Sequence, residues 1–256
     1  KLKYLSLNGN DLTGTIPSNL WQFSLLLELW IYNNRISGEL PASMLQEMKS
    51  LRILLAQNNR LEGSLQKVFN DAQNSTLRNI DISGNILTGS LPDALFTLPQ
   101  LRTVSAGKNC FSGRLPTAIC NSTRITTISL DGLGRNGNCP VVSALNHPYR
   151  YVKEVLFHTI QSNGVMNCIF SLPSLETLHM SGNGIYATLP SDINPPSSLQ
   201  NISLTHNRLY GSVPHKLMSR PYAEMDLSNN RFGGTLPSVA YDKSLEFNFD
   251  LAVNRL

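Results

Sequence analysis

The sequence predicts an α/β-type repeat solenoid in which each coil adds one strand to a parallel β-sheet. Two observations lead to this fold class. The 256 residues include 40 leucines and 26 asparagines, both well above ordinary usage. One frame of apolar positions followed by an asparagine also returns at intervals of 23 to 27 residues, a period typical of solenoids.

Each copy of the frame alternates apolar and polar residues before it reaches an asparagine. The first copy reads Leu2-x-x-Leu5-x-Leu7-x-x-Asn10, followed by Leu12-x-Gly14-x-Ile16-Pro17. This alternation predicts a short strand whose leucines point into the coil while the intervening side chains face solvent. A buried asparagine at the end of the strand can bond backbone groups of neighbouring coils. We therefore expect these residues to form the core, and we expect function at the variable positions.

The frame predicts about ten coils in a single domain that covers residues 1–256. Coils within 1–124 and 175–256 are regular, although the last one is truncated, and the absence of cysteine-paired caps indicates an uncapped fragment. Within 125–174 two irregular coils carry Leu133 and Ile160 in the asparagine slot. Two interpretations stay open. The pair is degenerate but still fits the solenoid, which we favour, or it forms an island that bulges out and contributes to recognition.

The segments Leu12-Thr-Gly-Thr-Ile-Pro17 and Leu87-Thr-Gly-Ser-Leu-Pro92 resemble the plant-type leucine-rich repeat. This repeat is known from the ectodomains of receptor-like kinases and receptor-like proteins, and from polygalacturonase-inhibiting proteins. The resemblance covers nearly the whole chain. It implies a right-handed superhelix with a concave parallel β-sheet and an extra strand after the main one. It also implies a secreted or cell-surface protein that recognises peptides, proteins or glycans on the concave face.

Composition and motifs argue against several other classes of protein. Charged residues make up 15% of the chain and the net charge is +4, without a dense run of Lys or Arg, so nucleic acid is not expected as a partner. No apolar stretch approaches the roughly 20 residues of a membrane helix. Nucleophile-elbow, phosphate-loop, zinc-protease and kinase signatures are missing from the sequence. We therefore expect no catalytic residues, no metal and no cofactor.

Four cysteines and three glycosylation sequons bear on the compartment. The cysteines lie in the central third of the chain, at Cys110, Cys120, Cys139 and Cys168. They allow three disulfide pairings, and four buried thiols in core positions fit the sequence equally well. Cys139 and Cys168 fall at nearly the same phase of adjacent coils, which would allow a staple between them. The sequons begin at Asn74, Asn121 and Asn201 and favour an extracellular location.

Aromatic and aliphatic side chains occupy the outward strand positions of the first three coils. They are Tyr4, Trp30, Tyr32, Ile53 and Leu55. Because aromatic anchors dominate binding hot spots, these positions predict a ligand-binding patch on the concave face, rimmed by Glu28 and Arg52. The alternative is that these residues pack against one another or against a missing N-terminal cap.

Histidines form a second candidate cluster further along the chain. His158, His179 and His206 lie on three successive predicted coils, with Glu154 and Glu176 beside them. Three imidazoles with two carboxylates could sense pH or hold a metal. We favour the simpler interpretation of a solvated polar face.

Together these features predict an extracellular recognition module, the ligand-sensing region of a receptor-like protein or receptor-like kinase. Its partner would be a protein, peptide or glycan bound on the concave face. Two alternatives stay open. One is a secreted leucine-rich repeat inhibitor of a cell-wall-degrading enzyme. The other is an intracellular scaffold, which predicts four reduced thiols and no glycan.

Overall fold

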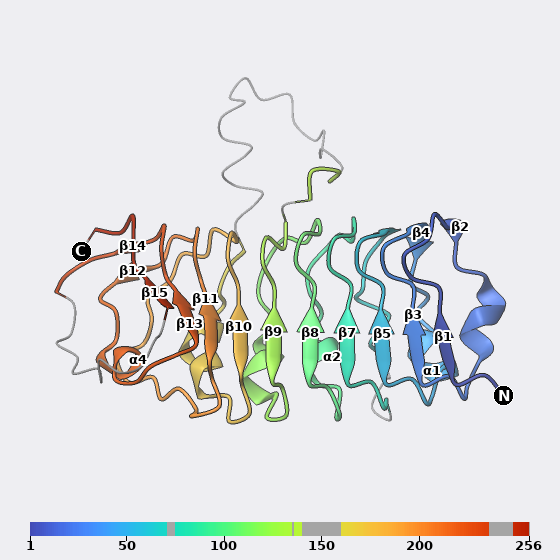
Figure 1. Ribbon diagram of the computed structural model, residues 1–256, viewed down its shortest axis with the longest axis horizontal. Coiled ribbons are helices and arrows are strands. Elements are labelled where there is room, and N and C mark those ends of the chain that lie inside the picture. Colours follow the sequence, from blue (N-terminus) through green and yellow to red (C-terminus); the bar gives the residue numbers. More distant parts are fainter. Residues whose placement is uncertain (71–74, 135, 140–159, 236–247, 256) are drawn as a thin grey trace, which may run out of the picture.

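A ten-stranded parallel sheet runs along the whole length of the molecule (Figure 1). The computed structural model describes all residues except 71–74, 135, 140–159, 236–247 and 256. Along the sheet the strands are β1 (Tyr4–Ser6), β3 (Glu28–Trp30), β5 (Ile53–Leu55), β7 (Asn79–Asp81), β8 (Thr103–Ser105), β9 (Thr127–Ser129), β10 (Thr177–His179), β11 (Asn201–Ser203), β13 (Glu224–Asp226) and β15 (Asn248–Asp250). The predicted solenoid is therefore confirmed.

Two smaller parallel sheets follow the main strands in their coils. The first contains β2 (Thr13–Thr15), β4 (Arg35–Glu39) and β6 (Arg60–Glu62), and the second contains β12 (Tyr210–Gly211) and β14 (Arg231–Phe232). They are the extra strands that the resemblance implies. Figure 1 shows them at opposite ends of the upper edge of the molecule.

Short helices lie in the return segments of the coils. They are η1 (Ser18–Gln22), α1 (Met44–Glu47), α2 (Asp93–Phe96), η2 (Thr117–Asn121), η3 (Val165–Asn167), η4 (Ile169–Ser171) and α4 (His215–Met218). Pro17, Pro92, Pro116 and Pro214 each stand directly before one of them, where a missing backbone N–H leaves no donor unpaired. In the described part of the chain, every helix is too short or too polar to cross a bilayer.

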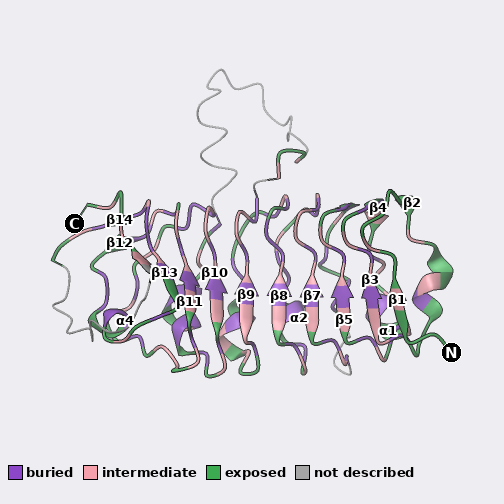
Figure 2. Ribbon diagram, viewed as in Figure 1, coloured by how far each residue is buried: buried purple, intermediate pink, exposed green. Residues whose placement is uncertain are grey.

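The core follows the alternation of the frame. The middle residue of each main strand from β3 to β13 is buried, and its two neighbours in the strand are half-buried in most cases (Figure 2). Leucine and isoleucine from the turns and the return helices complete one continuous apolar cluster along the solenoid. No single coil could bury its apolar face alone, so the stacking of coils supplies the stability.

Buried asparagines link each regular coil to the one before it. Asn85 is typical: its Oδ1 accepts a hydrogen bond from Leu61 N at 2.9 Å, and its Nδ2 donates to Ala56 O and Ile82 O at 3.0 Å. The same pattern recurs at Asn34, Asn59, Asn109, Asn183, Asn207, Asn230 and Asn254. This asparagine ladder confirms the role predicted for the slot.

The ladder and the repeat spacing both change between β9 and β10. Strand β9 pairs directly with β10, with Thr127 opposite Thr177, a separation of 50 residues, whereas Thr103 and Thr127 in the preceding pair are 24 apart. The second irregular coil, with its expected strand around Val155, would have to lie between β9 and β10. The favoured interpretation, in which both irregular coils fit the solenoid, is therefore wrong for the second one. Residues 140–159 themselves lie outside the described residues.

Both disulfides of the chain join coil five to this region. Cys110 is bonded to Cys139 and Cys120 to Cys168, with Cα–Cα distances of 5.4 Å in each pair. The staple that the sequence allowed between Cys139 and Cys168 does not form, and the alternative of four free thiols is wrong. Equal phase in the repeat was a poor guide here because β9 pairs directly with β10, so the coil assumed to carry Cys168 adds no strand between them. Each bond instead ties one flank of residues 140–159 to the regular stack.

Candidate binding surface

The register of the main sheet places the predicted patch residues on neighbouring strands. Trp30 lies between Ser6 and Leu55 on its neighbouring strands, and Glu28 lies between Tyr4 and Ile53. These side chains come from β1, β3 and β5 at the N-terminal end of the solenoid (Figure 1). We call Tyr4, Trp30, Tyr32, Ile53 and Leu55 the aromatic patch.

The members of the aromatic patch differ in exposure. Tyr4 has 61% of its surface exposed, whereas the other four side chains are half-buried. The indole Nε1 of Trp30 is buried and has no hydrogen-bond partner in the described part of the chain. Arg52 is exposed and Glu28 is half-buried, so a cation and an anion border the patch as expected. The structure thus offers an apolar surface with one largely exposed ring.

Small polar side chains cover the middle of the same face. The row that begins with Ser6, Trp30 and Leu55 continues through Asp81, Ser105 and Ser129 to His179. Asp81 is engaged locally, because its Oδ1 accepts hydrogen bonds from the N and Oγ of Ser83 at 2.9 and 2.6 Å. Beyond the aromatic patch the face therefore offers hydroxyl groups rather than apolar contacts.

The two histidines of the candidate cluster that the structure describes lie at different positions in their coils. His179 lies on β10 opposite Ser203, whereas His206 lies in the turn after β11, where its Nδ1 is 2.8 Å from Thr205 Oγ1. His158 and Glu154 lie outside the described residues, and Glu176 precedes β10 and is exposed. No group of three or more metal-ligating side chains occurs in the part of the chain that the structure describes. The placement of the histidines on successive predicted coils had suggested a cluster, but a shift of three residues along the coil separates His179 from His206.

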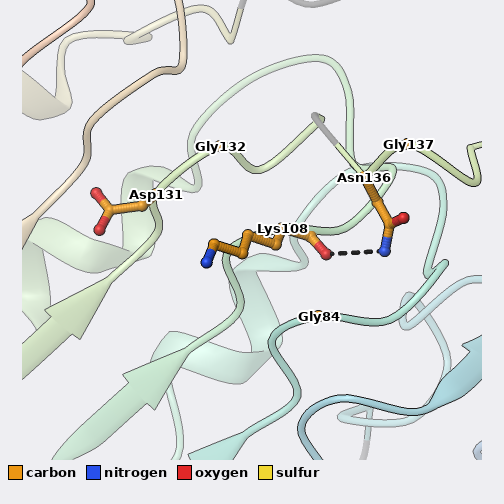
Figure 3. Close-up of a pocket in the computed structure, with 6 residues that line it drawn as sticks. All are labelled: Gly84, Lys108, Asp131, Gly132, Asn136 and Gly137. Atoms are coloured by element: carbon orange, nitrogen blue, oxygen red, sulfur yellow. Dashed lines mark hydrogen bonds between the residues drawn. The ribbon is translucent and has the colours of Figure 1, made fainter.

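A pocket that the sequence did not predict lies beside the junction of β9 and β10. It has a volume of about 420 Å³ and is lined by Gly84, Lys108, Asp131, Gly132, Asn136 and Gly137 (Figure 3). Lys108 is exposed and Asp131 is half-buried. Asn136 Nδ2 donates to Lys108 O at 3.2 Å, and Lys108 N donates to Asp131 O at 2.9 Å. A carboxylate and an ammonium group therefore border one hollow.

Two adjacent residues in the sequence, Gly107 and Lys108, could have pointed to this pocket. A Cβ atom at Gly107 would collide with the carbonyl oxygen of Asp131, so glycine is required for the close approach of these two coils. Lys108 follows with a φ of 52°, in a left-handed turn where several other coils have asparagine or glycine. Lysine in that position is an unusual residue, and it places a cation at the mouth of the hollow.

The three sequons occupy different environments. Asn121 is exposed at the end of η2, next to the disulfide-bonded Cys120. Asn201 is half-buried on β11, and its Nδ2 donates to Thr177 Oγ1 at 3.4 Å. Asn74 lies outside the described residues.

Comparisons with known proteins agree with the fold. The leucine-rich repeat family model matches residues 1–23, 76–98 and 174–195. Receptor-like protein 35 of Arabidopsis thaliana is 28% identical over 249 residues, which are 95% of this chain and 23% of that relative. Receptor-like protein 47 of the same species is 30% identical over 241 residues, which are 93% of this chain and 29% of that relative.

A solved structure extends the comparison. The Arabidopsis receptor kinase HAESA, crystallised in complex with a peptide hormone and a co-receptor, matches with a TM-score of 0.74 and 25% identity. The match covers 98% of this chain and 37% of that one. The chain spans about a quarter of the length of the two curated relatives. The resemblance to plant leucine-rich repeat receptors that the repeat motifs predict is thereby confirmed.

Proposed function

We propose that this chain is the ligand-sensing part of a receptor-like protein or receptor-like kinase, on the basis of its resemblance to plant leucine-rich repeat receptors. The aromatic patch carries the proposal, since Trp30 and Leu55 lie next to each other on a sheet face with no covering segment among the described residues. HAESA was solved with a peptide hormone, which supports a peptide as the class of ligand.

The geometry suits an extended peptide that crosses the strands of the main sheet. An apolar side chain of the ligand would pack against Trp30 and Leu55, where burial of apolar area supplies most of the affinity. The peptide backbone and its polar side chains would then follow the hydroxyl row through Ser105 and Ser129. Arg52 and Glu28 at the border would select the charge of the residues that flank the anchor.

An extracellular or cell-surface location fits the same proposal. Two disulfides form readily in the secretory pathway and are rare in the cytosol. Of the described sequons, Asn121 is the accessible acceptor, whereas a glycan on Asn201 would stand on the binding face. We expect the native protein to lose mass on deglycosylation, with the glycan mapped to Asn121 and all four cysteines oxidised. An unglycosylated protein with four free thiols would instead favour the intracellular scaffold.

The substitution Trp30→Ala tests the binding surface. The purified protein is screened against a library of synthetic linear peptides, and the affinity of each binder is then measured by calorimetry. We expect the substitution to weaken binding by ~2 kcal/mol or more, because a central aromatic anchor is lost. A matched control is Tyr186→Ala, which removes an exposed aromatic ring away from the main sheet.

Two results would contradict the proposal. One is equal loss of affinity in the Trp30→Ala and Tyr186→Ala proteins, which would show that the binders do not use the aromatic patch. The other is unchanged affinity in a Trp30→Ala protein whose circular dichroism and melting temperature match the wild type. A protein that inhibits a cell-wall-degrading enzyme but binds no peptide would support the secreted inhibitor.

A further inference from the structure

Three arginines occupy one equivalent slot on coils three, four and five. Arg52, Arg78 and Arg102 stand directly before the main strands β5, β7 and β8. Arg78 N donates to Arg52 O at 2.8 Å and Arg102 N donates to Arg78 O at 2.7 Å, so the backbone holds the three residues in register. The strand spacing of about 4.8 Å then separates neighbours in this row. The three arginines, which we call the basic row, lie along the edge of the main sheet where β5, β7 and β8 begin (Figure 1).

The side chains of the basic row have no anionic partner among the described residues. All three are exposed. In the described part of the chain the one salt bridge joins Arg35 to Asp11, and no side-chain hydrogen bond involves the basic row. The same slot holds Leu27 on coil two and Thr126 on coil six, which bound the row on both sides. Three unpaired cations at one-coil spacing create a local field that favours an anion.

The opposite end of the same face is acidic. Asp226 on β13 pairs in register with Asp250 on β15, and Glu224 is the other outward residue of β13. The Oδ1 atoms of Asp226 and Asp250 accept hydrogen bonds from Ser228 N at 2.9 Å and from Ala252 N at 2.7 Å. These bonds orient both carboxylates, and no salt bridge to a described cation neutralises them. Like charges on adjacent strands repel each other, so this group, which we call the acidic end, favours a bound cation.

The face between the basic row and the acidic end carries mostly uncharged side chains. On β9, β10 and β11 the outward strand positions hold Thr127, Ser129, Thr177, His179, Asn201 and Ser203. The slot of the basic row holds its first carboxylate at Glu176, directly before β10 and therefore on the acidic side of the face. Asp81 on β7 is an exception, but its Oδ1 already accepts two hydrogen bonds from Ser83. The charge of the face thus changes sign along the sheet.

We propose that the peptide bound on the concave face carries two acidic residues in one segment and a basic residue about seven residues away, and that these charges fix its direction. The inference rests on the proposed peptide recognition and deepens it. The acidic pair meets the guanidinium groups of the basic row, whose planar forks match carboxylates. The basic residue lies against Asp226 and Asp250. The acidic segment is therefore the one next to the aromatic patch.

The strand spacing sets the length of peptide between the two charges. In the main sheet β7, at the centre of the basic row, is five strand intervals from β13. These intervals of about 4.8 Å add to roughly 24 Å, which an extended chain rising about 3.3 Å per residue covers in about seven residues. Two acidic side chains on one side of an extended peptide are roughly 6.7 Å apart, within the roughly 9.6 Å that the basic row spans.

The change of sign along the face argues against a uniformly charged ligand. A polyanion that followed the sheet beyond the basic row would meet Asp226 and Asp250, and a polycation would meet the arginines at the other end. Like-charge contacts of this kind suppress wrong partners. A peptide can carry both signs at the required separation, so it matches the whole face.

A set of synthetic peptides of one composition tests the proposal. Each contains a leucine anchor, two glutamates and one lysine among serine and glycine spacers, and the members differ only in the order and separation of the charged residues. Calorimetry on the intact protein measures each affinity. We expect the tightest binding for the order leucine, glutamate pair, lysine, with about seven residues between the charges. Exchange of the glutamates with the lysine should weaken binding at least about tenfold, and binding of the preferred peptide should weaken as salt rises.

The double variant Arg78→Gln/Arg102→Gln tests which side chains meet the glutamates. It should lose about tenfold in affinity for the preferred peptide, on the basis of about threefold for each exposed ion pair. Replacement of the peptide's glutamates by glutamine should then cost this variant almost nothing, because the contact is already lost. The matched control Lys67→Gln/Lys216→Gln removes the same charge from two exposed residues outside the main sheet and should leave the affinity unchanged.

The double variant Asp226→Asn/Asp250→Asn tests the other end. Asparagine keeps an oxygen that accepts the bonds from Ser228 N and Ala252 N, so the fold is retained while the charge is lost. This variant should bind the preferred peptide and its lysine-to-glutamine form equally well, whereas the wild type should prefer lysine about threefold or more.

Three results would overturn the proposal. They are equal affinity for the two charge orders, equal loss in the arginine and lysine variants, and a cost of the glutamine peptide that is the same for the arginine variant as for the wild type. Binding without a preferred charge order would contradict this inference alone. Failure to bind any of the peptides would contradict the proposed peptide recognition, and this inference with it.

Discussion

The regular coils and the junction between β9 and β10 hold their neighbours by different means. In the regular stack a buried asparagine such as Asn85 makes two short hydrogen bonds to the coil before it and a third within its own coil. At the junction the slot holds Leu133, which is buried and can offer only its backbone to the ladder: Phe111 N donates to Leu133 O, and Leu133 N donates to Asn183 Oδ1. Two disulfides link coil five to this region instead.

This difference indicates that the disulfides compensate for the missing asparagine hydrogen bonds rather than for the longer connection between β9 and β10. Doubling the chain length between paired strands from 24 to 50 residues adds only about 0.6 kcal/mol of loop-closure entropy. A disulfide typically stabilises a protein by about 2–4 kcal/mol, so the longer connection alone does not explain two of them. The loss of the asparagine costs more than the longer connection, because each buried hydrogen bond that it would make contributes about 1 kcal/mol. Covalent bonds at the junction replace a side-chain network that a leucine cannot form.

Removal of both disulfides is the strongest way to test this contrast. Cys110→Ser and Cys120→Ser together should lower the free energy of unfolding by about 4–8 kcal/mol, the sum for two cross-links. Because each coil contacts mainly its neighbours, the loss should concentrate near the junction. Hydrogen exchange is expected to speed up around β8, β9 and β10 while β3 and β5 keep their protection.

The control for this prediction is chemical reduction. A reductant should destabilise the wild type by a similar amount and leave the double variant unchanged. Uniform loss of protection from β3 to β13 would show instead that the whole solenoid unfolds as one unit, and the contrast between the two regions would fail.

Periodicity was enough to predict the sheet but not its interruption. Leu2, Leu26 and Leu51 recur in equivalent slots, and each coil needs the same burial, so one rule describes all regular coils. Around Val155 the sequence still carries apolar residues at strand-like spacing, yet β9 pairs with β10. A local pattern cannot reveal that two strands 50 residues apart pair better with each other than with the segment between them. The pairing of the four cysteines could not be predicted for the same reason, because it depends on which coils are neighbours in the stack.

The candidate site also has parts that the repeat predicts and parts that it does not. Alternation placed Tyr4, Trp30 and Leu55 on one face correctly, because the register of β1, β3 and β5 follows from the repeat itself. The pocket beside Lys108 and Asp131 arises where the repeat fails, since Asn136 reaches it from the chain after the missing asparagine slot.

Two alanine substitutions compare the stack and the junction on a smaller scale. Asn85→Ala should cost about 2–4 kcal/mol of unfolding free energy, because it removes three buried hydrogen bonds and leaves Leu61 N without its side-chain acceptor, while Ala56 O and Ile82 O keep only the bonds from Asn59 and Asn109. Asn136→Ala removes two donated bonds, to Asn85 O and Lys108 O, from a half-buried side chain. Water can replace these bonds, so we expect a cost of about 1 kcal/mol. Urea unfolding of both variants gives the two values.

The ratio of these two unfolding costs shows whether Asn136 has the same structural role as the ladder residue Asn85. The two side chains have the same donors and acceptors, so a difference between them reports burial and network rather than chemistry. Equal costs would mean that Asn136 already serves as the ladder residue of its coil, displaced by three positions from Leu133. The disulfides would then add to a complete ladder rather than replace a missing step. A cost at Asn136 that appears only after Cys110→Ser would show that the covalent bond carries the junction while it is intact.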